Sequence, residues 1–230
     1  MFIPVYDHNR RVHVPIPYVN LTLIALNVLI FVFFQGAGAQ EAVAAASYSL
    51  GLIPVVLFDI RELAPQLQLL PEWMSIVTYA FLHGGFVHLI GNMLFLWVFG
   101  DNVEDAMGHF RYLLFYLICA AFSGFLYAAL DVNSEVPLIG ASGAVSGVVA
   151  AYLMLHPRVK VWVLVLGRIP LRLSAMWLLG AWVLYQFYNV FAAAESEVAW
   201  IAHVGGLIAG AVLVLFFRRK GVKLFDQAMS

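Results

Sequence analysis

The hydrophobic residues of this chain are gathered into long runs, separated by stretches that are rich in polar residues and glycine. A helix needs about 20 mostly apolar residues, within a range of roughly 17–25, to cross the core of a bilayer. Six runs meet this requirement, at residues 18–35, 86–106, 110–130, 141–157, 170–191 and 198–217. The pattern therefore predicts an all-α membrane protein, built as a bundle of six transmembrane helices.

The composition supports this class. The 230 residues are 63% hydrophobic and only 11% charged, with a mean hydropathy of +0.92. An ordinary soluble domain is about half apolar and about a quarter charged. The net charge of −1 provides no basic surface for nucleic acid. The single cysteine, Cys119, excludes an internal disulfide, and no Cys/His spacing is typical of a zinc site.

The length fits one domain, and the runs divide the chain into three parts. We expect a cytoplasmic N-terminal segment at 1–17, a transmembrane domain at 18–217 and a basic cytoplasmic tail at 218–230. Within the domain, residues 36–75 form a long outer loop. The first run follows two arginines, as in a signal peptide, but a signal peptide has an apolar core of only about 7–15 residues. We therefore interpret this run as a retained helix.

The basic residues predict the orientation, because cytoplasmic loops carry an excess of Lys and Arg. When the loops are assigned alternately to two sides, Arg61 stands alone on one side and every other Lys and Arg falls on the other. Both termini are therefore expected in the cytoplasm, and the second, fourth and sixth helices enter the membrane from outside. A bacterial inner (plasma) membrane is the expected location.

Polar residues occur in the outer halves of these three helices, where ionisable side chains are rare and usually functional. The second helix carries His88 and Asn92, the fourth carries Ser142, and the sixth carries His203. His203 lies about five residues into its helix, which is roughly 7–8 Å at a rise of 1.5 Å per residue. Three helices thus place polar groups at one depth.

Glycines favour a reactive role for Ser142. Two of them flank it in the sequence "GASG", where they allow a sharp turn and the close approach of another chain. The fourth and sixth helices also carry matching ridges of small residues, at Gly143 and Gly147 and at Gly206 and Gly210. Such ridges let membrane helices pack closely, which would bring a serine hydroxyl within reach of a histidine base.

His88 and Asn92 are four residues apart and share a helix face. Both side chains can donate hydrogen bonds, so together with the backbone N–H of Ser142 they could stabilise an oxyanion. The alternative is that they bond each other or the backbone of a loop. His83 does not share their face, and we interpret it as a structural residue that holds the loop above the site.

Other polar residues have simpler explanations. Ser146 is expected to bond the backbone of its own helix or to pack as a small residue. No carboxylate lies inside a predicted helix near His203, so a Ser–His dyad fits better than a triad, although a loop could fold inward. The loop candidates are Asp131, Glu135, Glu195 and Glu197. We assign no role to His8, His13, His109 and His156.

Taken together, "HGGFVHLIGNM", "GASG" and "HVGGLIAG" on three such helices resemble the rhomboid family of intramembrane serine proteases. The resemblance covers residues 18–217. It implies that Ser142 is the nucleophile and His203 the general base, with His88, Asn92 and the Ser142 backbone N–H forming the oxyanion hole. It also implies cleavage of transmembrane protein substrates within membrane lipids, with no metal or cofactor. The acidic residues of "FGDNVEDAMGHFR" (99–111) are interpreted as turn and cap residues.

Two positions depart from the family pattern. Some members carry a tyrosine one turn after the nucleophile, beneath the histidine ring, where this chain has Ser146. Another residue must therefore orient His203. Many members also carry a Trp-Arg pair in the first loop, whereas here Trp73 is followed by Met74.

The fifth helix is expected to carry an aromatic stripe at a spacing of three residues, formed by Trp182, Tyr185 and Tyr188. It is either an interfacial aromatic belt or a lateral gate through which substrate enters. Two other functions compete with proteolysis: a catalytically silent rhomboid-like protein that binds membrane clients, and a small transporter. A transporter would need polar groups across the midplane, whereas these cluster on one side.

Overall fold

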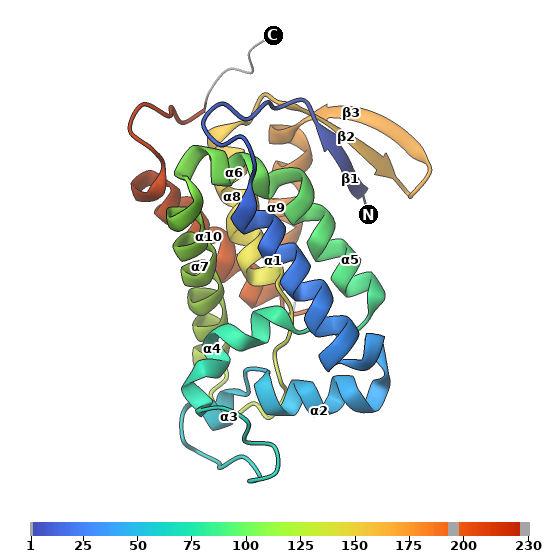
Figure 1. The fold of residues 1–230 in the computed structure, drawn as a ribbon, viewed down its shortest axis with the longest axis vertical. Coiled ribbons are helices and arrows are strands. Elements are labelled where there is room, and N and C mark those ends of the chain that lie inside the picture. Colours follow the sequence, from blue (N-terminus) through green and yellow to red (C-terminus); the bar gives the residue numbers. More distant parts are fainter. Residues whose placement is uncertain (1, 193–197, 226–230) are drawn as a thin grey trace.

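The computed structural model describes residues 2–192 and 198–225 and is mostly helical (Figure 1). Its longer helices are α1 (Tyr18–Leu29), α2 (Gln40–Leu50), α5 (Phe86–Phe95), α7 (His109–Leu130), α8 (Ser142–Leu155), α9 (Ala175–Phe191) and α10 (Trp200–Phe217). The shorter ones are α3 (Pro54–Leu57), α4 (Ser75–Thr78) and α6 (Asp101–Met107). Single π-helical turns, η1 (Ile30–Phe34) and η5 (Leu96–Gly100), extend α1 and join α5 to α6.

A helix lies in each of the six predicted runs. Within the described residues, three helical stretches are long and apolar enough to cross a membrane: Phe86–Met107, His109–Leu130 and Trp200–Phe217. Two apolar helices are shorter, Tyr18–Phe34 and Ser142–Leu155. A helical membrane protein is therefore confirmed, while six crossings and their orientation stay predictions.

The all-α expectation was incomplete, because the described residues also form a three-stranded antiparallel sheet. Its strands are β1 (Phe2–Asp7), β2 (Lys160–Val165) and β3 (Ile169–Ser174), in that order. The fifth helix consequently begins at Ala175 rather than at residue 170. The sequence "KVWVLV" of β2 alternates β-branched residues as a strand does, and Gly167, with φ of +68°, closes the hairpin to β3.

The sheet lies at the end of the bundle where the chain begins, and we call this the terminus end (Figure 1). The opposite loop end is formed by α2, α3 and the segments around them (Figure 1). Residues 36–75 are therefore not an open loop, since they contain α2, α3 and two single 3-10 turns, η2 (Gly36–Gly38) and η3 (Glu72–Met74). A third such turn, η4 (Tyr79–Phe81), follows α4.

Two acidic residues of α6 hold the N-terminal segment in place. The carboxylate of Asp105 accepts hydrogen bonds from the backbone N–H groups of Val12, His13 and Val14, at 2.5–3.0 Å. Glu104 accepts those of Val19 and Asn20, in the first turn of α1. Since the first N–H groups of a helix lack intrahelical partners, Glu104 caps α1. The interpretation of these acids as turn and cap residues is thus confirmed for Glu104 alone, since Asp105 binds the N-terminal loop and Asp101 pairs with Arg11.

Helix α8 lies at the centre of the bundle, and its residues 143–152 are all buried. It packs against α7, α9 and α10. A Cβ atom added to Gly206 would overlap the backbone carbonyl of Gly143, and one added to Gly210 would overlap that of Gly147. The predicted contact between the two glycine ridges is therefore confirmed.

This contact generates a stability prediction. Gly206→Ala should lower the free energy of unfolding by roughly 1–3 kcal/mol, because the added methyl group forces α8 and α10 apart. The matched control is Gly91→Ala in α5, where a Cβ meets no atom within 4 Å. That substitution should be neutral or stabilising, since alanine is the better helix former. Thermal unfolding of both variants in detergent measures the difference, and equal effects would contradict the packing described here.

Candidate active site

Ser142 is the first residue of α8, and the loop before it is fixed by backbone hydrogen bonds. Leu138 exchanges two such bonds with Leu52, in the segment between α2 and α3. The N–H of Gly140 donates to the carbonyl of Tyr79 at 2.9 Å. Ser142 itself is only partly buried, in contrast to the residues that follow it. The start of α8 is therefore held rigidly while its serine stays accessible.

Gly140 brings His88 close to this serine. Its φ of +123° lies in the region that favours glycine. A Cβ atom added there would lie 2.6 Å from Cε1 and Nε2 of His88, and 3.7 Å from Oγ of Ser142. The imidazole of His88 thus occupies the space that a side chain at this position would need. The structure therefore places the His88 ring and the Ser142 hydroxyl on the same side of Gly140.

The contacts of His88 favour one tautomer. The N–H of Gly84 donates to its Nδ1 in a long hydrogen bond of 3.4 Å, which leaves the ring proton on Nε2, facing Gly140. The buried ring of His83 packs edge-on against that of His88, with centroids 5.1 Å apart. Gln35 exchanges two hydrogen bonds with the backbone of His83, each 2.9 Å long. The His83 backbone therefore anchors the loop, while its two ring nitrogens have no hydrogen-bond partner among the described residues, so a structural role for the ring stays an interpretation.

Asn92 lies one turn below His88 on the same face of α5. Its side chain is buried, and its Nδ2 group has no hydrogen-bond partner among the described residues. Buried donors are nearly always paired, so an unpaired one calls for an explanation. A substrate oxygen that develops negative charge would supply the missing acceptor.

The contacts between the glycines also determine where His203 lies along the length of the bundle. Because Gly206 lies beside Gly143 and Gly210 beside Gly147, the two helices run parallel in register. His203 precedes Gly206 by three residues, so it lies toward the end of α8 that begins at Ser142. Within the described part of the chain, no hydrogen bond joins the Ser142 hydroxyl to His203. Catalytic hydrogen bonds are often loose without substrate and tighten when it binds.

Helix α9 orients His203. The Oε1 atom of Gln186 lies 2.8 Å from Nδ1 of His203, and the Gln186 side chain is 1% exposed. Since this oxygen can only accept, Nδ1 carries the proton and Nε2 is free to act as a base. The ring of Trp182 stacks on the imidazole at 6.3 Å, and that of Trp200 meets it edge-on at 5.9 Å.

Gln186 was not predicted, although an amide inside an apolar run is itself a signal. Together with Trp182 it contacts the His203 ring, and position 146 is Ser146 rather than the tyrosine of some family members. Ser146 donates to the carbonyl of Ser142 at 2.7 Å, so its expected backbone bond is confirmed. Among the acidic loop candidates, Glu135 pairs on the surface with Arg61 at 2.6 Å. Glu195 and Glu197 lie outside the described residues.

The three aromatic residues of α9 do not form a single stripe. Trp182 points inward, where it contacts His203 and also Phe95 of α5, at a centroid distance of 5.7 Å. Tyr185 packs edge-on against Trp200, while Tyr188 is 67% exposed. A spacing of three residues drifts around a helix of 3.6 residues per turn, which accounts for the divergence.

A family model for the Rhomboid domain matches residues 70–220, which is more than half of the chain. The chain belongs to the rhomboid family. The matched range contains every residue of the candidate site. The positions of Ser142, His203, His88 and Asn92 are therefore those of a rhomboid domain. The family includes proteins that are named as proteases.

Three relatives illustrate the breadth of the family. Rhomboid protease GluP of Bacillus subtilis is 35% identical over 60% of this chain and 25% of its own length. Rhomboid-like protein 11, chloroplastic, of Arabidopsis thaliana is 32% identical over 68% of this chain and 57% of its own. Rhomboid protein 1, mitochondrial, of Saccharomyces cerevisiae is 27% identical over 90% of this chain and 66% of its own. The chain thus spans less than two thirds of the length of these relatives.

The site geometry predicts which serine reacts. A fluorophosphonate probe should label Ser142 covalently, because this hydroxyl is accessible and has hydrogen-bond donors beside it. Labelling should vanish in Ser142→Ala and persist in Ser146→Ala, since Ser146 is buried and bonded to its own helix. Mass spectrometry of the labelled protein identifies the site. Persistent labelling of Ser142→Ala would show that the nucleophile lies elsewhere.

Proposed function

We propose that this rhomboid is an intramembrane serine endopeptidase, with Ser142 as nucleophile and His203 as general base. The observation that carries the proposal is that the His88 imidazole and the Ser142 hydroxyl both lie beside Gly140. The unpaired Asn92 amide lies one turn along α5 from His88, and His203 lies in the first turn of α10, toward the end of α8 that begins at Ser142. Peptide hydrolysis by a serine nucleophile requires the nucleophile, a base and oxyanion donors close together.

The reaction then proceeds in two steps. The Oγ of Ser142 attacks the scissile carbonyl while Nε2 of His203 takes its proton. The oxyanion accepts hydrogen bonds from Nε2–H of His88, Nδ2–H of Asn92 and the backbone N–H of Ser142. His203 next protonates the leaving amine, which leaves an acyl-enzyme. Water, deprotonated by His203, hydrolyses this ester and restores Ser142.

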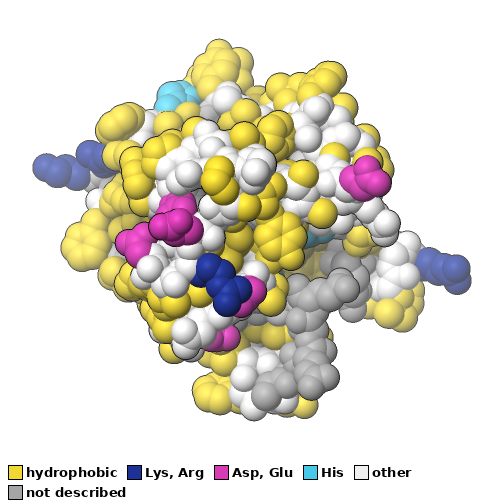
Figure 2. Space-filling model, turned by 90° about the horizontal axis from the view of Figure 1, so that it is seen from below, with side chains coloured by type: hydrophobic (Ala, Val, Ile, Leu, Met, Phe, Trp, Pro, Cys, Tyr) yellow, Lys and Arg dark blue, Asp and Glu magenta, His cyan; other side chains and the backbone are white. Residues whose placement is uncertain are grey.

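The proposal includes six membrane crossings with both termini in the cytoplasm of a bacterial inner membrane. Charge supports this orientation, because the terminus end carries almost all of the basic residues. Acidic side chains are scattered among apolar ones on the loop end (Figure 2). Ser142 at the start of α8 would then lie toward the outer surface, where water can reach it.

Substrate would enter sideways from the lipid, past α9. In this arrangement Tyr185 and Tyr188 remain gate residues, whereas Trp182 also supports His203. A peptide bond inside an intact helix is shielded, so the bound segment must be extended. We therefore expect cleavage of single-span proteins near the outer face, after a small residue such as alanine and close to residues that weaken a helix.

The decisive experiment reconstitutes the purified chain with a panel of single-span proteins and maps the cut by mass spectrometry. Cleavage should occur in the outer third of the span or just outside it, and should be absent in Ser142→Ala. Replacing helix-weakening residues of the substrate by leucine should slow it, because glycine and proline cost a helix about 1 and 3 kcal/mol. Binding without cleavage by the wild type would instead identify a silent client-binding rhomboid.

Gln186 is a positioning residue, and its substitution has a characteristic signature. Gln186→Leu should lower kcat on the order of 10²-fold, because His203 loses the acceptor that fixes its tautomer and orientation. Gln186→Glu should retain more activity but move the acidic limb of its pH profile upward, since a carboxylate stabilises the imidazolium.

The matched control for Gln186 is Asn189→Leu. Asn189 is a second buried amide of α9, and its side-chain N–H donates to the Tyr185 carbonyl of its own helix, at 2.6 Å. This variant should keep the wild-type pH profile. Equal losses in the Leu variants, with no shift of the profile in Gln186→Glu, would assign Gln186 a purely structural role.

A further inference from the structure

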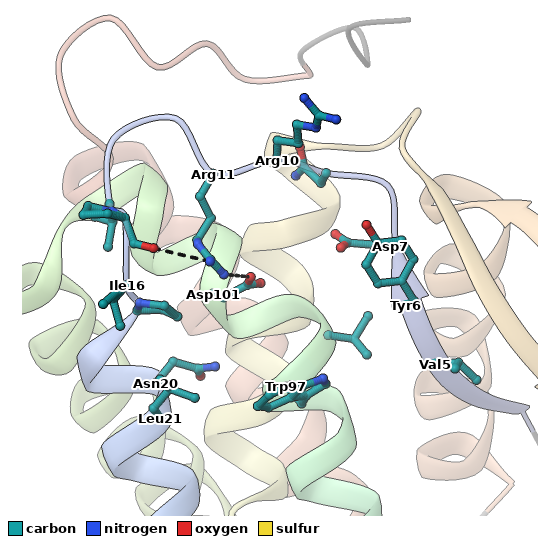
Figure 3. A pocket seen from close by; sticks show the side chains of 15 residues that line it. Val5, Tyr6, Asp7, Arg10, Arg11, Ile16, Asn20, Leu21, Trp97 and Asp101 are labelled. Carbon is teal, nitrogen blue, oxygen red and sulfur yellow. Dashed lines mark hydrogen bonds and ion pairs between the residues drawn. The ribbon is translucent and has the colours of Figure 1, made fainter.

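A cavity lies at the terminus end of the bundle, and its lining shares no residue with the candidate active site. Its volume is about 700 Å³. Three elements line it: the chain from β1 to the start of α1, the first turn of α1, and η5 with the residue after it. Figure 3 shows Trp97, Asn20 and Leu21 at its floor, with Arg11 and Asp101 on one side and β1 on the other.

The lining of this cavity is apolar at the floor and cationic at the mouth. Trp97 and Leu21 belong to apolar helices and are 60% and 37% exposed, so they present hydrocarbon surface. Arg10 and Arg11 are exposed above them, and Arg10 extends outward at the mouth (Figure 3). Leu21 lies in the first turn of α1, where the first predicted membrane span begins, while Trp97 lies midway along the stretch Phe86–Met107. The start of a predicted span is the level at which a bilayer is expected to pass from headgroups to acyl chains.

The loop that carries the arginines is held rigidly. Its backbone is bound by Asp105, as described above. Arg11 bonds a carboxylate oxygen of Asp101 at 2.7 Å and the carbonyl of Pro15 at 3.4 Å. A guanidinium carries five N–H donors, so Arg11 keeps donors for a further acceptor. The loop is therefore already ordered before any ligand binds in the cavity.

The charges of the cavity do not balance. Asp101 pairs with Arg11, while Arg10 has no hydrogen bond or ion pair among the described residues. Asp7 is the second acid of the lining. Burial raises the pKa of Asp7 to about 7, although the Tyr152 hydroxyl donates to its carboxylate at 2.5 Å. Asp7 thus offsets only part of the remaining positive charge near neutral pH.

We propose that this cavity binds an anionic phospholipid, whose phosphate contacts Arg10 and Arg11 and whose acyl chain lies along Trp97 and Leu21. A guanidinium matches phosphate oxygens in geometry and charge. A soluble phosphate would use the arginines but not the apolar floor. The combination of both surfaces at the expected membrane boundary favours a lipid, and the proposal is independent of the peptidase activity.

The test is a lipid titration of the full-length, delipidated chain, followed by native mass spectrometry. Phosphatidylglycerol should bind about fivefold more tightly than phosphatidylcholine with the same acyl chains, because one basic residue near a membrane surface contributes a factor of this size for an anionic lipid. Glycerol phosphate, which has the phosphate but no acyl chain, should neither bind detectably nor displace phosphatidylglycerol.

Matched variants distinguish the contribution of the arginines from that of the apolar floor. Arg10→Gln should weaken phosphatidylglycerol binding about fivefold, whereas Arg172→Gln, an exposed arginine of β3 outside the cavity, should not. Trp97→Ala should weaken both lipids, while Trp177→Ala, at the exposed start of α9, should weaken neither.

Two results would overturn the proposal. Equal binding of both phospholipids, or equal effects of the two arginine variants, would show that the cavity does not recognise an anionic headgroup. Displacement of phosphatidylglycerol by glycerol phosphate would identify a site for soluble phosphate. A failure of proteolysis would affect none of these outcomes.

Discussion

The close contact of α8 with α10 is the constraint on which the candidate site depends. Glycines on both helices remove the side chains that would separate them, so that backbone meets backbone. Ser142 begins α8 and His203 lies in the first turns of α10, so the register of this contact sets their relative heights. In a membrane, where helix association depends on packing rather than on the hydrophobic effect, small residues are the natural means to such proximity.

A second layer of contacts gives each polar group one orientation. Gly140 leaves room for His88, and the Gly84 N–H selects its tautomer. Gln186 does the same for His203, from the helix that also carries the proposed gate. The base and the gate would therefore be coupled, because an outward movement of α9 would withdraw both Gln186 and Trp182 from the imidazole. Where the family resemblance leads one to expect a tyrosine in some members, this chain has Ser146, and the contacts to His203 come from Gln186 and Trp182 of α9.

Much of this arrangement could be predicted from sequence. Long apolar runs indicate membrane helices, and the spacing of glycines indicates the ridges along which those helices pack. The sheet was missed because the apolar run from residue 170 was interpreted as continuous helix, although β-branched alternation before it indicated a strand. Gln186 was missed because its partner is distant in the sequence and only tertiary packing joins them. The inward turn of Trp182 likewise depends on how α9 is rotated, which helical spacing does not specify.

The central claim is that Ser142 and His203 act as one unit, and a double-mutant comparison tests it most directly. Cleavage rates of a mapped substrate would be measured for Ser142→Ala, His203→Ala and the variant that carries both substitutions. If the two side chains act in the same step, the double variant should be no slower than either single one, since residues of one catalytic unit are strongly non-additive. Losses that multiply, or substantial cleavage by Ser142→Ala, would contradict the account.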